Sequence, residues 1–331
     1  MAIPDFLAYR LHAGPDGAPP QGRFETLSEH ALSPGDTLIK VAYAGLNYKD
    51  ALAQAGQGRI IRDYPRIGGI DLSGTVVRST DPALTPGQEV VVHGFGLGVD
   101  RDGGYAEYAR VQHEWVLPLP AGIGLRDAAV LGAAGYTAAL SLYWMERCGL
   151  APGQGEVLVT GATGGVASIA IDILNQRGYT VCAMSGKAHA IAYLHALGAA
   201  RVEPPPDLSA GVKPLASARW AGVVDSVGGP LLAHILAGLQ PEGVAAAFGN
   251  AGGSTLPGSV IPFILRGVKL LGINANSPLP LRREIWRLLG SAYRPARLDL
   301  AAHVIVPQDL PQSLASMLTR GSIGRTVVRF S

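Results

Sequence analysis

Cysteine and charge are both scarce in this chain, and each shortage excludes a class of function. The 331 residues include two cysteines, Cys148 and Cys182, which are too few for a disulfide framework or a zinc site of four thiolates. Charged residues make up 16% of the chain, and the net charge of +2 comes without a long basic block. We therefore expect a protein of the reducing cytoplasm that does not bind nucleic acid.

We also expect no apolar run of membrane-spanning length. Residues such as Asp172 and Arg177 interrupt the apolar segments, so we expect no membrane span. The start of the sequence, MAIPDFLAYR, shows no basic stretch followed by an apolar one, and we expect no secretion signal. Hydrophobic residues nevertheless reach 48%, which supports a large buried interior, and a chain of this length predicts two domains.

Several catalytic signatures are absent as well. His93 and His113 are not spaced as an HxxxH pair and do not lie beside a cysteine, so we interpret them as loop or edge histidines. The chain has no GxSxG sequence of a hydrolase, and it has no Tyr-x-x-x-Lys pair, which a short-chain dehydrogenase would require. We therefore expect a reaction that proceeds without a metal ion.

Short β segments separated by turns fill the chain up to about residue 125. Apolar or alternating segments at 36–44, 72–79 and 88–95 predict strands, and Pro-Gly pairs mark turns before two of them. This spacing predicts a compact and largely antiparallel β domain. A helix is predicted over 126–149, where alanine, leucine and methionine recur at helical spacing.

A regular alternation of strand and helix begins at about residue 156, with helical runs at 166–178 and 230–239. It predicts an α/β fold with a doubly wound parallel sheet. After about residue 281 the pattern returns to that of the first third, ending in a strand at 325–330, and we expect this tail to fold back onto the N-terminal β domain. The buried-strand candidates of the parallel sheet are 156–160, 179–184, 221–226, 243–248 and 268–273.

A glycine-rich turn connects the first of these strands to its helix in EVLVTGATGGVASIAI. Gly161, Gly164 and Ala167 lie three residues apart, a variant of the dinucleotide fingerprint in which glycines let the backbone approach a pyrophosphate closely. The amides of Gly165 and Val166 open the helix and present its positive end to the anion. Glycine-rich turns end strands in many proteins, but the strand before this turn and the helix after it favour a dinucleotide site.

The next strand ends at CAMSGK (182–187) without the acidic residue typical of an NAD site. Ser185 lies 21 residues beyond Gly164, close to where that carboxylate grips the ribose. A hydroxyl and an ammonium group here favour a 2′-phosphate, which a carboxylate would repel, so we predict NADPH as the cofactor. A lysine that is merely solvated at a helix start is the alternative. The residues assigned to the phosphate are Ser185, Gly186, Lys187 and, as a second cation, Arg201.

Seven stretches resemble one known family along nearly the whole chain: LNYKDALA (46–53), GRIIRDYPRIGGIDLSGTV (58–76), GGYAEYARV (103–111), GAAGYTAAL (132–140), VTGATGGVAS (159–168), VVDSVGG (223–229) and PFILRGVKLLGIN (262–274). On these motifs the chain resembles the zinc-independent, quinone-oxidoreductase-like branch of the medium-chain dehydrogenases/reductases, and within it the NADPH-dependent acrylyl-CoA reductases. The resemblance implies a GroES-like catalytic domain, 1–125 and 281–331, split around a Rossmann domain, 126–280, with the active site in the cleft between them.

The same resemblance implies roles for individual residues. Asn47 and Tyr48 fall beside the nicotinamide, where the tyrosine can pack on the ring and either side chain can donate to a substrate carbonyl. Asp71 matches an acidic residue near the metal of zinc relatives, and we expect it to order the site. The other cofactor residues implied are Thr163, Gly164, Gly165 and Val166 at the pyrophosphate, and Asn250, Ile264, Asn274 and Ala275 at the nicotinamide end.

The chain departs from the subgroup at three places. Lys187 stands where arginine is common, which keeps the charge but loses bidentate recognition. The loop EPPPD (203–207) is poor in basic residues, and the segment after the last strand of the parallel sheet reads GINANS (272–277) where relatives tend to carry an acid and a serine. The last segment borders the substrate, so its difference bears on the substrate more than on the cofactor.

The activity implied is hydride transfer from NADPH to the β-carbon of acryloyl-CoA, which yields propanoyl-CoA. The thioester carbonyl accepts the developing charge as an enolate, so hydrogen-bond donors can replace a metal. Arg59, Arg62 and Arg66 are candidates for the CoA phosphates, although surface arginines often only face solvent. NADPH-dependent reduction of quinones or other enones, and an NADPH-binding sensor or structural protein without turnover, stay open as alternatives. A homodimer is expected through the strand at 268–273.

Overall fold

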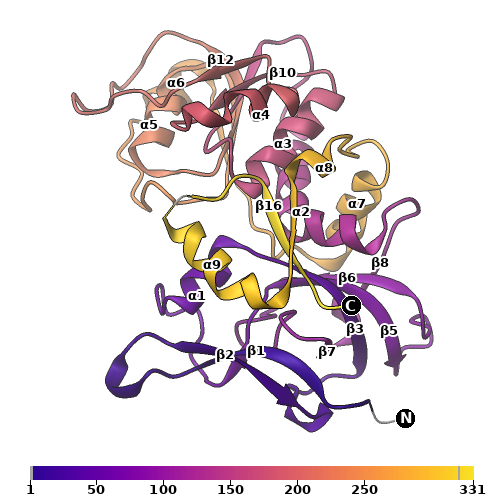
Figure 1. The fold of residues 1–331 in the computed structure, drawn as a ribbon. Coiled ribbons are helices and arrows are strands. Elements are labelled where there is room, and N and C mark those ends of the chain that lie inside the picture. Colours follow the sequence, from indigo (N-terminus) through magenta and orange to yellow (C-terminus); the bar gives the residue numbers. More distant parts are fainter. Residues whose placement is uncertain (1–2, 320) are drawn as a thin grey trace. The chain divides into compact units, whose positions relative to one another are not determined.

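The computed structural model describes residues 3–319 and 321–331, which form two compact units (Figure 1). Unit 1 contains the chain up to Ala134, the segment Asn276–Trp286 and the residues from Ala302 onward. Unit 2 contains Gly135–Ala275 and Arg287–Ala301. Each unit therefore combines segments that lie far apart in the sequence, and the domain boundaries given above stay a prediction.

Unit 1 is built on a seven-stranded sheet whose order is β15-β16-β3-β5-β6-β8, with β7 also paired to β3. All of its pairs are antiparallel except β15 with β16. The last strand of the chain runs beside β3, with Val327 opposite Gly45, so the tail completes the N-terminal sheet (Figure 1). The strands are β3 (Thr37–Gly45), β5 (Asp71–Ser79), β6 (Glu89–His93), β7 (Tyr108–Val111), β8 (Leu117–Pro118), β15 (Ala302–Ile305) and β16 (Arg325–Arg329).

A second, three-stranded sheet and two further helices also belong to unit 1. The sheet has the order β2-β1-β4, formed by β2 (Gln21–Leu27), β1 (Phe6–His12) and β4 (Arg66–Ile67). Helix α1 (Tyr48–Gln54) lies beside α9 (Leu310–Leu318), and the Gln54 amide donates to the Pro311 carbonyl at 3.0 Å (Figure 1). Apolar side chains from the strands and both helices form one buried core, which confirms the predicted antiparallel β domain.

Unit 2 contains a six-stranded parallel sheet, which confirms the predicted doubly wound fold. The strand order is β11-β10-β9-β12-β13-β14. From β9 the chain adds strands toward one edge of the sheet, and from β12 it adds them toward the other edge, so the topological switch point lies between β9 and β12. Ligands of such sheets bind outside the carboxyl ends of the strands at that point. The strands are β9 (Glu156–Val159), β10 (Thr180–Met184), β11 (Arg201–Glu203), β12 (Trp220–Asp225), β13 (Leu239–Ala247) and β14 (Lys269–Gly272). The helices are α3 (Gly165–Gln176), α4 (Ile191–Ala196), α5 (Gly229–Ala237) and α6 (Ile261–Arg266).

Helix α2 (Leu125–Arg147) carries the chain from unit 1 into unit 2 and is broken at Gly132, whose φ is +40°. It is long and apolar enough to cross a membrane, so the expectation that no run reaches this length was wrong: Ala128 to Met145 contains no charged residue. However, 83% of its most apolar window is buried, as in the core helix of a globular protein. A cytoplasmic location stays a prediction.

Two short helices lie in the return segment that follows the parallel sheet: α7 (Leu279–Leu289), most of which belongs to unit 1, and α8 (Leu298–Ala301), which belongs to unit 2. Two acids, the buried Asp172 and the half-buried Glu146, hold part of this segment in unit 2. The Tyr293 hydroxyl donates to Glu146 at 2.6 Å, and the Arg297 backbone amide donates to Asp172 at 2.6 Å. Asp172 lies on α3, so the return segment is tied to a helix of the parallel sheet.

Candidate functional site

The glycine-rich loop follows β9 and leads into α3. Gly161 has a φ of +56°, and a Cβ there would lie 2.4 Å from the Ser226 Oγ. A larger residue would therefore collide with Ser226, which directly follows β12. Gly164 is the N-cap residue of α3, and a Cβ at that position would approach nothing closer than the Gly161 carbonyl oxygen, at 3.3 Å. The loop therefore leaves the first turn of a twelve-residue helix open to close approach.

Asp225 supports this loop from the end of β12. The Thr160 Oγ1 donates to its carboxylate at 2.6 Å, and the Gly228 amide donates to it at 2.7 Å. The Ser226 Oγ in turn donates to the Thr160 carbonyl at 2.9 Å. Burial raises the pKa of Asp225. Sequence analysis missed this residue, although an acid at the end of an otherwise apolar strand was a visible signal.

Ser185, Gly186 and Lys187 follow β10 directly. The Ser185 Oγ accepts a hydrogen bond from the Lys187 backbone amide at 3.1 Å, which leaves its own hydrogen for an oxygen of a ligand. A Cβ on Gly186 would have no neighbour closer than Pro205, at 3.9 Å. Partial burial lowers the pKa of the Lys187 ammonium group. Three consecutive residues therefore provide a hydroxyl group, an exposed glycine backbone and a cation.

Arg201, the predicted second cation, begins the neighbouring strand β11. Its Nη2 lies 2.7 Å from Glu156 Oε2, and its Nη1 also pairs with Glu203. These two carboxylates raise the pKa of the guanidinium, and Glu203 also pairs with Arg219 at 2.8 Å. The charge of Arg201 is therefore balanced within the sheet, and its role at a phosphate stays a prediction.

The predicted nicotinamide-end residues lie on the other half of the parallel sheet. Asn250 follows β13 and Asn274 follows β14, and both side chains are exposed. The Ile273 amide donates to the Ala247 carbonyl at 2.9 Å, so the two strand ends are joined at this edge. Ile264 on α6 is 70% exposed, and Ala275 is half-buried.

Among the pyrophosphate-loop residues, Thr163 is buried, Gly164 is exposed, and Gly165 and Val166 form the first turn of α3. The loop residues, the Ser185–Lys187 turn and the two asparagines all follow carboxyl ends of parallel strands. The unit 2 residues thus fit a dinucleotide in their chemistry, with backbone amides for a pyrophosphate and a hydroxyl and ammonium group for a further phosphate.

The second candidate centre lies in unit 1, where Asn47 is the N-cap residue of α1. Its Nδ2 donates to Asp50 Oδ2 and to Asp71 Oδ2, both at 3.1 Å, and its Oδ1 accepts from Arg325 Nη1 at 3.1 Å. Both amide hydrogens therefore already have carboxylate acceptors. In this arrangement the Asn47 side chain has no hydrogen left to donate to a substrate.

Tyr48 is the first residue of α1 and differs from Asn47 in its exposure and in its hydrogen bonding. It is 43% exposed, and within the described part of the chain its hydroxyl makes no hydrogen bond. The phenol therefore remains able to donate a hydrogen bond to a ligand, while its ring offers an apolar face.

Asp71 is completely buried at the start of β5. Its Oδ1 accepts from the Gly45 amide at 2.7 Å, while its Oδ2 accepts from the Ala133 amide at 3.0 Å and from Arg325 Nη2 at 2.7 Å. The sequence predicts that Asp71 orders this site, but it does not indicate Arg325 as its partner. The pair is separated by 254 residues, and no local pattern joins them.

Asp50 is a second buried carboxyl group beside this pair. It accepts hydrogen bonds from the Asn47 and Ile70 backbone amides, both at 3.0 Å. Burial first, and then the negative charge of Asp71, raise its pKa to about 6. The centre therefore contains two acids and one arginine around the Asn47 amide.

The three arginines proposed for the CoA phosphates do not behave alike. Arg59 and Arg62 are exposed, and in the described residues they form no ion pair. Arg66 instead lies on β4, where its Nη1 donates to Ser33 Oγ at 3.1 Å and lies 3.4 Å from Asp102 Oδ1. Its side chain is largely buried, which indicates a structural role in unit 1.

A doubly wound sheet with a glycine loop at its switch point, in one chain with an antiparallel β unit, defines a two-domain dehydrogenase or reductase architecture. Family models agree: residues 33–121 match the alcohol dehydrogenase GroES-like domain, and residues 165–290 match a domain described as zinc-binding dehydrogenase.

Individual relatives cover nearly the whole chain. YhfP of Bacillus subtilis, whose name assigns it provisionally to the quinone oxidoreductases, is 45% identical over 92% of this chain and 93% of its own. The acrylyl-CoA reductase AcuI of Ruegeria pomeroyi is 41% identical over 93% of this chain and 94% of its own. The chain therefore belongs to the medium-chain dehydrogenase/reductase family of oxidoreductases, in its quinone-oxidoreductase-like branch.

Solved structures agree with this assignment. The yhdH oxidoreductase of Salmonella enterica in complex with NADP has a TM-score of 0.95 and 41% identity, and the match covers 98% of this chain and all of that one. The Bacillus subtilis yhfP structure with NAD bound has a TM-score of 0.95 and 43% identity, covering 99% of this chain and all of that one. Both nicotinamide cofactors thus occur among similar proteins.

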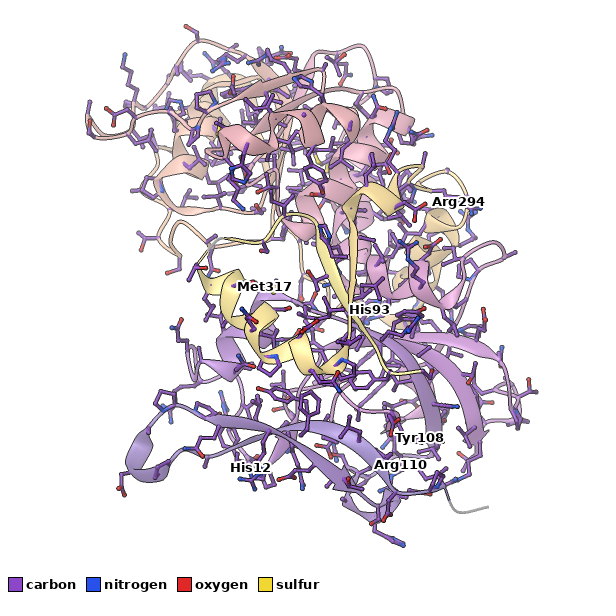
Figure 2. The ribbon with its side chains drawn as sticks, viewed as in Figure 1. His12, His93, Tyr108, Arg110, Arg294 and Met317 are labelled. Carbon is purple, nitrogen blue, oxygen red and sulfur yellow. The ribbon has the colours of Figure 1, made fainter. Side chains whose placement is uncertain are left out.

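The description of one matched domain as zinc-binding raises the question of a metal site here. Among residues 3–319 and 321–331, no group of three or more His, Cys, Asp and Glu side chains could hold a metal ion. His93, labelled in Figure 2, is buried at the end of β6, where its Nε2 accepts from Trp286 Nε1 at 2.9 Å. Both carboxylate oxygens of Asp71 already accept hydrogen bonds, from Arg325 and from backbone amides. These donors do not fit zinc.

Proposed function

We propose that this protein is an NADPH-dependent reductase of activated C=C bonds, with acryloyl-CoA as its substrate and propanoyl-CoA as its product. The observation that carries the cofactor is the sequence Ser185-Gly186-Lys187 at the end of β10, where a hydroxyl and a cation stand in place of an acid. The substrate is supported by the name of the Ruegeria relative.

We assign the following roles to the chain's own residues. The backbone amides at the start of α3 bind the pyrophosphate, and Ser185 and Lys187 bind the ribose phosphate. When bound, NADPH supplies a hydride to the β-carbon of the substrate. Tyr48 donates a hydrogen bond to the thioester oxygen as negative charge develops there, which is the role that a preorganised donor performs best. Water supplies the proton to the α-carbon.

Tyr48, rather than Asn47, is the donor in this proposal. Both hydrogens of the Asn47 amide are held by Asp50 and Asp71, whereas the Tyr48 hydroxyl has no partner in the described part of the chain. Asn47 then acts by holding the N-terminus of α1. Arg59 and Arg62 attract the CoA phosphates, and Arg66 is not needed for this because Asp102 neutralises it.

Reduction of quinones or other enones is the second candidate, favoured by the name of YhfP. Steady-state NADPH oxidation with acryloyl-CoA, crotonyl-CoA and a quinone in parallel separates the two. We expect kcat/KM for acryloyl-CoA to exceed that for the quinone by at least about tenfold. Comparable efficiency on both would remove the CoA preference.

The same substrate panel can also be used with a variant and to test the non-catalytic alternative. Replacing Arg59 and Arg62 by glutamine should raise KM for acryloyl-CoA and leave KM for the quinone unchanged, because the quinone carries no phosphate. Tight NADPH binding without oxidation across the whole panel would instead favour a sensor or structural protein, and the reductase proposal would be abandoned.

The edge strand β14 supports the proposal that the protein is a homodimer. It is the last strand of the parallel sheet, and an unpaired edge is a template for a second chain. Exposed apolar side chains precede it on α6, with Ile264 at 70% and Leu265 at 65% exposure. A second copy of this chain would cover both features.

A further inference from the structure

Arg325 is a buried cation that joins four segments of unit 1. It is the first residue of β16, and 2% of its surface is exposed. Its guanidinium donates to Asp71 Oδ2 at 2.7 Å, to Asn47 Oδ1 at 3.1 Å, to the Val130 carbonyl at 3.1 Å, and to the Leu46 carbonyl. A planar guanidinium with five hydrogens suits this role because it donates in several fixed directions.

Two glycines make room for the ion pair. A Cβ at Gly45 would lie 1.9 Å from Arg325 Nη2 and 2.4 Å from Asp71 Oδ1. At Gly132, whose φ is +40°, a Cβ would lie 2.6 Å from Asp71 Oδ2 and 2.9 Å from Arg325 Nη2. Any side chain at either position would separate the charges or displace them. The local backbone is therefore shaped around this pair, and the break in α2 falls where the pair needs space.

The charges around Asn47 explain why a buried cation is needed. Asp50 from α1 and Asp71 from β5 are both buried and face the same amide. The other titratable groups there are Tyr105, whose hydroxyl donates to the Gly45 carbonyl at 3.2 Å, and Arg325 itself. Two buried carboxylates without a cation would carry a large desolvation cost. Arg325 offsets part of this cost and fixes the direction in which the Asn47 side chain points.

We propose that Arg325 is a positioning residue for Tyr48. Arg325 and the two acids hold every polar atom of the Asn47 side chain, Asn47 is the N-cap residue of α1, and Tyr48 is the next residue. The Tyr48 side chain is itself weakly anchored, so its placement depends on the backbone that precedes it. This inference rests on the proposed function, which makes Tyr48 the donor to the substrate. A displacement of about 1 Å at such a donor can cost about 100-fold in rate.

The test is a double-mutant cycle between Arg325→Gln and Tyr48→Phe, measured as kcat and KM for NADPH-dependent reduction of acryloyl-CoA. We expect Arg325→Gln to lower kcat by about 10- to 100-fold and to leave KM for NADPH within about twofold, because the residues proposed to bind the pyrophosphate and the ribose phosphate all belong to unit 2. Tyr48→Phe should lower kcat in the wild-type background and have little further effect in the Arg325→Gln background. Additive effects of the two substitutions would overturn the inference.

Two more variants separate positioning from general stability. Arg325→Lys keeps the charge and should restore part of the lost kcat. Gly132→Ala keeps every charge but crowds the ion pair, so it should lower kcat as Arg325→Gln does, and it serves if Arg325→Gln does not fold. Arg297→Gln removes the ion pair with Asp172 in unit 2, at 3.3 Å, and should lower stability while leaving kcat unchanged. A loss of kcat in Arg297→Gln as large as that in Arg325→Gln would contradict a specific role.

Hydrogen exchange gives a result that does not depend on turnover. Amides of residues 47–54 should exchange faster in Arg325→Gln than in the wild-type protein, while those of α3 should not change. Unchanged exchange at 47–54 would overturn the inference. If the wild-type protein reduces none of the substrates but this local change is seen, the proposed function fails while the anchoring of α1 by Arg325 stands.

Discussion

At the scale of single residues, Lys187 carries the proposed preference for NADPH most directly. Sequence analysis paired it with Arg201 as a second cation, but the structure surrounds Arg201 with Glu156 and Glu203. A guanidinium that is already neutralised by two acids contributes less to a new phosphate than one without them. Lys187 and the hydroxyl of Ser185 are therefore expected to dominate the recognition of the 2′-phosphate.

Lys187→Glu should weaken NADPH binding by about 10- to 100-fold, because it replaces a charge-assisted hydrogen bond with a repulsion. Binding of NADH, which lacks the phosphate, should change by less than about threefold. Fluorescence titration of both cofactors measures this, and Arg201→Gln is the matched control, with a smaller expected effect on NADPH. Equal weakening of both cofactors would count against the assignment.

At the scale of elements, helix α1 combines a catalytic candidate with a buried acid in its first turn. Asp50 is the third residue of the helix, and its carboxylate accepts from the Asn47 amide as the acid of a capping box does. Most such acids face water, but this one is buried beside Asp71. The carboxylate caps the helix, but its ionised form lowers the stability of the folded protein because it is buried beside a second acid.

Asp50 should make the protein less stable as pH rises from about 4 to about 6. Its folded-state pKa is raised to about 6 from the ordinary value of 3.8, so the folded state keeps a proton that the unfolded state releases. This contribution to stability is complete below pH 3.8 and is lost as pH passes through 6. Relative to Asp50→Asn, the wild-type protein should lose up to about 3 kcal/mol of unfolding free energy over this range.

Urea denaturation of both proteins between pH 4.5 and 7.5 checks this expectation. Asp16→Asn, at an exposed position between β1 and β2, is the control, and its stability curve should run parallel to that of the wild-type protein. A curve for Asp50→Asn that is also parallel to the wild type would show that Asp50 does not titrate in this range.

Most elements were predictable from local patterns, because apolar spacing records which face of a segment is buried. The five predicted strands of the parallel sheet all occur, and the helices at 166–178 and 230–239 lie within a few residues of α3 and α5. The break in α2 at Gly132 was not predicted, since the alanine-rich sequence around it is typical of an unbroken helix. The backbone departs there to leave space for Asp71 and Arg325.

At the scale of the whole molecule, the edge of the parallel sheet supports a prediction about assembly. We expect the protein to sediment with twice the monomer mass and Leu265→Asp to sediment as a monomer, since a charge in an apolar contact between copies disfavours association. Leu265 is already exposed in the single chain, so folding should be unaffected. Val306→Asp, at another exposed apolar position in unit 1, is the control and should stay dimeric. A monomeric wild-type protein would contradict the proposal.

The sequence by itself determined the alternation of strands and helices, the glycine loop and the absence of an acid after the second strand of the parallel sheet. Each of these features depends on residues that are close together in the sequence, so a local pattern predicts it. The tertiary structure decided which charges meet. It placed Arg201 between two acids and buried Arg325 against Asp71 across 254 residues. It also brought Asp50 and Asp71 to the two hydrogens of the Asn47 amide, which is why we propose the Tyr48 hydroxyl as the donor. Such pairings depend on the order of strands in a sheet, which local spacing does not record.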